Sequence, residues 1–89
     1  MNKVLIITTE NCEACRCIRN IIEDVKQEHP TFTISSYDFT ETPEFIKSQV
    51  IFTDFPTVVF LNDKNVIKYH FKGTMSKKKV LQLINDINF

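Results

Sequence analysis

The feature that most constrains this chain is a pair of cysteines at the junction between a strand-like and a helix-like segment. Residues 3–9 form a continuous apolar and β-branched run, which is typical of a strand buried on both faces. From Glu13 to about Glu28 the apolar positions recur at helical spacing, namely Cys17 or Ile18, Ile21, Ile22 and Val25. Cys12 and Cys15 therefore lie where a buried strand ends and a helix begins.

A Cys-x-x-Cys pair at the start of a helix has a specific chemistry. The unpaired N–H groups and the positive dipole end of the first turn stabilise a thiolate. Because Cys15 follows Cys12 by three residues, both lie within one turn, and a disulfide can close with little backbone movement. We predict that Cys12 is the attacking sulfur and Cys15 the resolving sulfur of an exchange that passes through a mixed disulfide.

Two further elements are expected in the middle of the chain. An alternating pattern that begins at Phe32 predicts a second strand, which ends in a polar loop after Phe39. A short helix should follow, with Thr42 as its N-cap and Pro43 at its first position. This helix is expected to direct three apolar side chains inward, those of Phe45, Ile46 and Val50.

The last third of the chain predicts a hairpin and a closing helix. Residues 57–61 and 66–71 are β-branched and aromatic, and a turn-rich link joins them. Ser76 is the expected N-cap of the last helix, whose apolar positions are Val80, Leu81, Leu83, Ile84 and Ile87. The element order is therefore β-α-β-α-β-β-α.

This order predicts one α/β domain over residues 1–89, with a mixed sheet of four strands and helices on both faces. The strands at residues 3–9 and 57–61 should be central, because their apolar runs do not alternate. The cysteines then lie at the carboxyl edge of a central strand, which is where functional groups collect in open α/β sheets.

Length, charge and hydropathy exclude several classes of protein. A second domain with its own core is not expected in 89 residues. Eleven basic residues balance eleven acidic residues, which argues against binding to nucleic acid or to a membrane surface. The apolar run at the N-terminus is too short for a signal peptide, so we expect a cytoplasmic protein. We also expect a monomer.

Metal binding is the alternative to redox chemistry. Three clustered cysteines, Cys12, Cys15 and Cys17, are soft ligands, but a structural zinc ion needs four, and neither His29 nor His70 is an obvious fourth. A redox-inactive or metal-carrying interaction module, with a site shared across a dimer, stays open. On a helix Cys17 is turned by about 200° from Cys15. We expect it to be a small buried hydrophobe, and a redox-sensing thiol is the other option.

Three motifs in order give the chain a family resemblance: Cys-Glu-Ala-Cys at 12–15, Asp-Phe-Pro-Thr-Val-Val-Phe at 54–60, and Lys-Gly-Thr-Met-Ser-Lys at 72–77. With these motifs the chain resembles the thioredoxin superfamily over almost its whole length. The resemblance implies a thioredoxin fold in which Pro56 is cis and faces the dithiol, and in which Phe55, Pro56 and Gly73 bind substrate. Phe55 would offer its backbone by strand addition, so the substrates would be protein disulfides of broad sequence.

The resemblance also implies an electron donor, either a thioredoxin reductase with NADPH or the glutathione system, and no bound cofactor. The chain departs from the family pattern at two positions that tune the thiols. Ile6 stands at the position of a buried aspartate, and Glu13 follows Cys12 and should disfavour its thiolate by like charge. We therefore expect Cys12 to be less acidic, and resolution by Cys15 to be slower, than in a thioredoxin.

Overall fold

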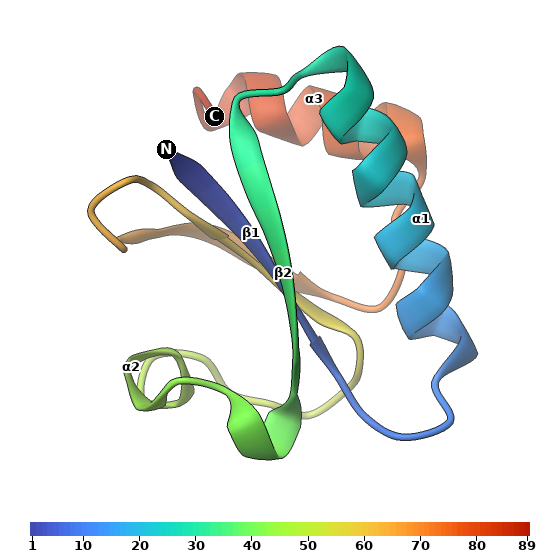
Figure 1. Ribbon diagram of the computed structural model, residues 1–89, viewed down its shortest axis with the longest axis vertical. Coiled ribbons are helices and arrows are strands. Elements are labelled where there is room, and N and C mark those ends of the chain that lie inside the picture. The colour runs from blue at the N-terminus through green and yellow to red at the C-terminus, as the bar shows by residue number, and fades with distance from the viewer.

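The computed structural model describes all residues from Met1 to Phe89, and its elements follow the expected order (Figure 1). The one addition is a 3₁₀ turn, η1, where the sequence predicts a polar loop. The elements are β1 (Asn2–Thr8), α1 (Glu13–Glu28), β2 (Phe32–Asp38), η1 (Phe39–Glu41), α2 (Glu44–Lys47), β3 (Thr57–Leu61), β4 (Ile67–Lys72) and α3 (Lys77–Asp86).

The four strands form one mixed sheet in the order β2-β1-β3-β4. Strands β1 and β2 are parallel, whereas β3 is antiparallel to both of its neighbours. The prediction that β1 and β3 are the central strands is therefore confirmed. In the register of these two strands Ile7 is opposite Thr57, which brings the carboxyl end of β1 beside the start of β3.

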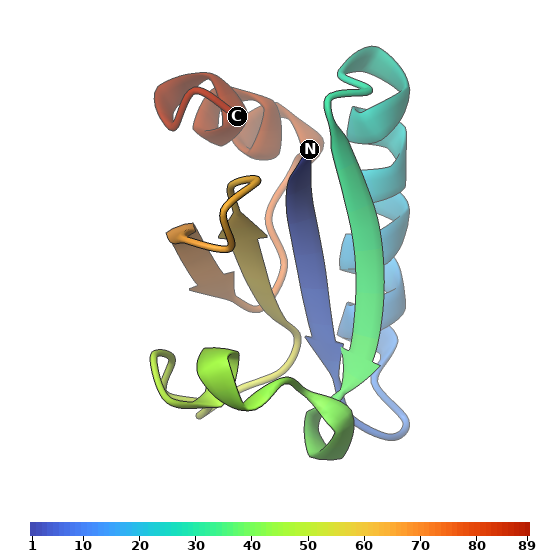
Figure 2. The same ribbon diagram turned by 60° about the vertical axis from the view of Figure 1, so that its left-hand side comes forward.

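Helices cover the two faces of the sheet unequally, as Figures 1 and 2 show. Helices α1 and α3 pack on one face, where their apolar stripes meet alternate residues of the central strands, including Val4, Ile6, Val58 and Phe60. The opposite face is covered only by α2 and the segment that follows it. There, Leu5, Ile7, Val59 and Leu61 of the strands contact Ile46 and Val50. Because side chains alternate along each strand, the core has two halves. We call the half between the sheet and helices α1 and α3 the thick half, and the half between the sheet and α2 the thin half.

The short helix α2 differs in detail from the expectation. Ile46 and Val50 are buried, but Phe45 is 40% exposed, so the prediction that it points inward is wrong. A helix of one turn presents only one side to the sheet, and Ile46 occupies that side. Thr42 does not cap this helix either, because Pro43 is the N-cap and the Thr42 hydroxyl donates a hydrogen bond to the carbonyl of Asp38.

The closing helix α3 begins as predicted. The Ser76 side chain is the N-cap and accepts a hydrogen bond from the Lys79 N–H at 3.2 Å. Lys77, Lys78 and Lys79 are exposed, in agreement with a solvated basic run. None of the helices has the length and apolar character that a membrane crossing requires.

Candidate redox site

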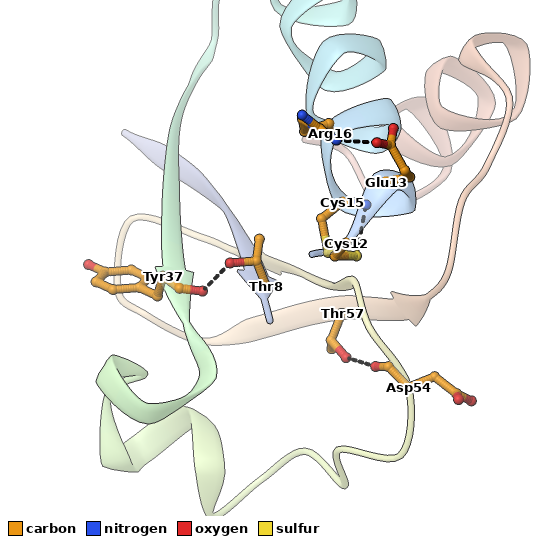
Figure 3. Close-up of a disulfide and its surroundings, with 8 residues drawn as sticks. All are labelled: Thr8, Cys12, Glu13, Cys15, Arg16, Tyr37, Asp54 and Thr57. Atoms are coloured by element: carbon orange, nitrogen blue, oxygen red, sulfur yellow. Dashed lines mark hydrogen bonds and ion pairs between the residues drawn. A yellow bond between two sulfur atoms is a disulfide. The ribbon is translucent and has the colours of Figure 1, made fainter. Parts of the chain in front are cut away.

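The two predicted cysteines lie together at the amino end of α1. Cys12 is the N-cap residue of this helix, and its Sγ accepts a hydrogen bond from the Cys15 N–H at 3.1 Å (Figure 3). The two side chains form a disulfide across a Cα–Cα distance of 5.2 Å. Asn11, with a φ of 54°, turns the chain from the end of β1 into the helix. The sequence therefore located the pair through local features alone.

The two sulfurs differ in their access to solvent. Cys15 is only 5% exposed, whereas Cys12 is half-buried at the surface. A reactant that approaches from solvent meets Cys12 first. This difference matches the order in which an attacking and a resolving sulfur would act.

A second loop, residues 53–56, lies at the same end of the sheet and is called the Pro56 loop below. The Phe55–Pro56 peptide bond is cis, which is the conformation that the family resemblance implies. The Gly73 N–H donates a hydrogen bond to the Pro56 carbonyl at 2.8 Å, so two of the expected substrate-binding residues are in contact. Figure 3 shows Asp54 and Thr57, which flank the proline, in the surroundings of the disulfide.

Phe55 carries free main-chain groups. Neither its N–H nor its C=O takes part in a hydrogen bond within the protein. The neighbouring positions are held, because the Thr57 hydroxyl donates to the Asp54 carbonyl at 2.8 Å. Phe55 therefore presents an unpaired donor and an unpaired acceptor between two residues, Asp54 and Pro56, whose carbonyls accept hydrogen bonds.

Three phenylalanines form an aromatic cluster beside this loop, and only Phe55 was predicted as a site residue from the sequence. The Phe39 ring lies 5.2 Å from Phe52 and 5.6 Å from Phe55, measured between centroids. Lys47 Nζ lies 4.8 Å from the centroid of the Phe39 ring. The spacing of Phe52 and Phe55 before a proline could have indicated that these two rings lie together. Phe39 joins the cluster only through the turn η1, which was not predicted.

The turn η1 is fixed by a hydrogen-bonded carboxylate. Asp38 is its N-cap and accepts hydrogen bonds from the hydroxyl and the N–H of Thr40, at 2.7 and 3.0 Å. Hydrogen bonds to the charged form stabilise it, so these contacts hold the pKa of Asp38 below its ordinary value of 3.8. The Asp38 cap thus helps to fix the turn that carries Phe39.

Charged groups beside the disulfide are already paired. Glu13, which was expected to disfavour the Cys12 thiolate, forms an ion pair with Arg16 one turn along the helix. Arg19 Nε lies 3.3 Å from Glu23 Oε1. Both pairs are exposed and therefore weak. Arg16 nevertheless offsets the negative charge of Glu13, which weakens the expected effect of Glu13 on the Cys12 thiolate.

A pocket of about 360 Å³ opens on the β2 side of the disulfide. Its lining comes from the end of β1, the first turns of α1 and one residue of β2: Thr8, Thr9, Asn11, Cys12, Cys15, Arg16, Arg19 and Ser36. Only the two cysteines among these residues were predicted from sequence motifs. Thr8, Thr9, Asn11, Arg16 and Arg19 flank the cysteines along the chain, and only Ser36 is brought to the pocket by the parallel pairing of β1 and β2.

Cys17 is exposed, so the expectation that it is a small buried hydrophobe is wrong. Its neighbour Ile18, which is fully buried, occupies the inward position on the helix instead. The three cysteines therefore do not converge on one point. No group of three or more His, Cys, Asp and Glu side chains lies close enough to hold a metal ion, and the donor set does not fit a zinc site.

Comparison with curated proteins gives one relative of limited overlap. Over 69 residues the chain is 30% identical to a mitochondrial thioredoxin domain-containing protein of Dictyostelium discoideum. The match covers 78% of this chain and 54% of the relative, so the chain spans about half the length of that protein.

Solved structures share the fold at low sequence identity. The structure of desulfothioredoxin from Desulfovibrio vulgaris superimposes with a TM-score of 0.81 at 22% identity, covering 96% of this chain and 80% of that one. A thioredoxin-like protein from Clostridium perfringens gives 0.80 at 21% identity, with 98% and 71% covered. The thioredoxin fold is thereby confirmed. Finally, the family model described as Thioredoxin matches residues 2–86. With almost every residue inside that match and the cysteine pair at disulfide distance, the chain belongs to the thioredoxin family.

Proposed function

We propose that this protein is a dithiol–disulfide oxidoreductase that reduces disulfides in other proteins. The observation that carries the proposal is the environment of Cys12. Its sulfur caps α1, accepts the Cys15 N–H, and is more accessible than the sulfur with which it forms a disulfide. An N–H group that points at a sulfur stabilises negative charge there, as a nucleophilic thiolate requires.

The exchange would take place in two steps. In the reduced protein the Cys12 thiolate attacks one sulfur of the substrate disulfide, forms a mixed disulfide, and releases the other substrate sulfur as a thiolate. The Cys15 thiol, lying within the same turn, loses its proton and attacks Cys12 Sγ. The second substrate sulfur leaves as a thiolate, and the Cys12–Cys15 disulfide forms. Two electrons have then passed from the protein to the substrate.

The Pro56 loop would hold the substrate during this exchange. The free N–H and C=O of Phe55 can pair with an extended segment, a mode that gives affinity with little dependence on side chains. The aromatic cluster adds an apolar surface beside that segment. Gly73, the third residue that the resemblance implies binds substrate, would also support the loop, because its N–H donates a hydrogen bond to the Pro56 carbonyl.

The oxidised protein must be reduced again by a donor. We propose a thioredoxin reductase with NADPH or the glutathione system, and the two are separated by coupling each system to the protein and following NADPH consumption. Turnover with one purified system and not with the other identifies the donor.

Reduction of insulin by dithiothreitol tests the proposed function. Wild type should accelerate insulin precipitation, and Cys12→Ser should give the rate of dithiothreitol alone. After reduction and removal of the dithiothreitol, Cys15→Ser should accumulate a mixed disulfide with insulin that mass spectrometry detects. Cys17→Ser is the matched control and should retain the wild-type rate, because Cys17 lies outside the site. Equal turnover in wild type and Cys12→Ser would refute the proposal. No turnover in wild type would favour a redox-inactive interaction module.

A further inference from the structure

We propose that the pocket on the β2 side of the disulfide binds a small thiol that carries a carboxylate, and that this compound reduces the Cys12–Cys15 disulfide directly. The pocket is called the arginine pocket below, and its residues are those given above. The inference rests on the proposed function, because it uses the same two sulfurs. It adds a second reactant, which approaches from a different side.

The arginine pocket and the Pro56 loop lie on opposite flanks of the disulfide. The sheet order places β2, which contributes Ser36, on one side of β1, and β3, which follows Pro56, on the other. Both cysteines line the pocket, so a ligand inside it reaches the bond that must be broken. A volume of about 360 Å³ is within the range of roughly 300–1,000 Å³ that small-molecule sites occupy.

The lining selects a polar and anionic ligand. Arg16 and Arg19 are neighbours on one face of α1, and no acidic side chain lines the pocket. Each guanidinium has five N–H donors, of which the ion pairs with Glu13 and Glu23 use one nitrogen each. The remaining donors suit a carboxylate, which arginine binds in a bidentate manner. Threonine, serine and asparagine side chains supply further hydrogen bonds around it.

The distance between the arginines and the sulfurs limits the size of the ligand. Arg16 and Arg19 lie four and seven residues beyond Cys12, which is about 6 and 10 Å along the helix axis. Because both arginines and both cysteines line one pocket of about 360 Å³, a single small ligand can place its carboxylate at a guanidinium and its sulfur at Cys12. A short mercapto acid or a small peptide thiol has this size.

The reaction uses two molecules of the thiol. The thiolate of the first attacks Cys12 Sγ, the Cys12–Cys15 bond breaks, and Cys15 leaves as a thiolate that takes up a proton. The thiolate of the second attacks the sulfur of the first, releasing their shared disulfide and the Cys12 thiolate. Two thiols have been oxidised to one disulfide, and the protein has gained two electrons.

The test compares two small thiols that differ in charge. The rate constant for reduction of the Cys12–Cys15 disulfide is measured with mercaptopropionate and with mercaptoethanol, each per concentration of thiolate, by acid quench and mass spectrometry. Wild type should prefer mercaptopropionate by about fivefold to tenfold, and high ionic strength should reduce that preference. The double variant Arg16→Gln/Arg19→Gln should lose the preference.

A matched control removes two charges elsewhere. Lys78 and Lys79 are exposed on α3, and Lys78→Gln/Lys79→Gln should keep the wild-type preference. Three results would overturn the inference. Wild type could show no preference for mercaptopropionate, the arginine variant could keep the preference, or the lysine variant could lose it to the same extent. Because mercaptoethanol has no carboxylate, its rate shows whether each variant still presents an intact disulfide. If wild type reduces insulin but shows no preference for mercaptopropionate, this inference is refuted and the proposed function is not.

Discussion

Single backbone positions decide how the Pro56 loop is held. Gly73 has a φ of 83°, a conformation that L residues rarely adopt, and its N–H donates to the Pro56 carbonyl. No atom lies within 4 Å of the place where its Cβ would be. The need for glycine therefore comes from the backbone conformation and not from a lack of space.

Replacement of Gly73 by alanine should consequently destabilise the protein without a steric clash. We expect a loss of about 1–2 kcal/mol in the free energy of unfolding, measured by urea denaturation. Gly73→Asn is the matched control and should cost less, because asparagine tolerates positive φ, as Asn11 and Asn65 do here. An equal cost for both variants would show that the conformation is not the cause.

At the scale of elements, an ion pair joins the carboxyl end of α1 to the amino end of α3. Lys77 Nζ at the start of α3 lies 2.6 Å from Glu28 Oε2 at the end of α1. Ser76, the residue before, caps α3 through the Lys79 N–H. Local hydrogen bonds and one long-range ion pair thus fix where α3 begins.

Loss of the cap at Ser76 should shorten α3 at its amino end. Ser76→Ala leaves the Lys79 N–H without its acceptor, and we expect a loss of about 1 kcal/mol in unfolding free energy, measured by urea denaturation. Ser76→Asp retains an acceptor and should stay close to wild type. A loss as large in Ser76→Asp would mean that the hydroxyl acts in another way.

The ion pair between α1 and α3 makes a pH-dependent contribution to stability. The hydrogen bond and the positive charge from Lys77 hold the pKa of Glu28 below its ordinary value of 4.5. A lowered pKa in the folded state gives stability that is present above pH 4.5 and is lost as the pH falls through the folded value.

Glu28→Gln should therefore be slightly less stable than wild type near neutral pH, and the difference should vanish in acid. Urea midpoints of both proteins at neutral pH and below the folded pKa of Glu28 measure this, and the effect should be small because the pair is exposed. A difference that grows on acidification would contradict the assignment.

For the molecule as a whole, the aromatic contacts of the core lie away from the disulfide, because Phe60 pairs with Val4 near the start of β1 and the cysteines follow the other end of that strand. Phe60 is fully buried in β3, and its ring centroid lies 5.4 Å from Phe89 and 6.1 Å from Phe71. The disulfide also lies at the other end of α1 from the ion pair that joins α1 to α3. We therefore expect that a change at Phe60 weakens the core without a change at the sulfurs.

Phe60→Leu should test this separation. We expect a loss of about 1–2 kcal/mol in the free energy of unfolding, because the smaller side chain leaves part of the aromatic contact unfilled. The rate of disulfide reduction by mercaptoethanol should remain that of wild type at a temperature where both proteins are folded. A parallel loss of rate and stability would show that the site depends on this half of the core.

The sequence predicted what depends on neighbours along the chain. The cysteine pair at the start of α1, the Ser76 cap and the two central strands follow from local pattern, and the structure has all of them. Cys17 and Phe45 were misplaced because pattern alone did not show which of two adjacent apolar residues faces the sheet. The aromatic cluster and the arginine pocket were not predicted, since both arise where separate elements meet.

The unequal covering of the sheet has a consequence for motion. The thin half of the core contains six buried residues against eleven in the thick half, and Phe52 and Phe55 pack against the thin half. Segments with fewer buried contacts open locally at a lower free energy, so backbone amides around α2 should exchange with solvent faster than those of β1 and β3. The loop that would meet incoming proteins thus belongs to the adaptable half, while α1, which carries the sulfurs, is anchored in the rigid one. This division would let the Pro56 loop adjust to partners of different shape while the position of the disulfide stays the same.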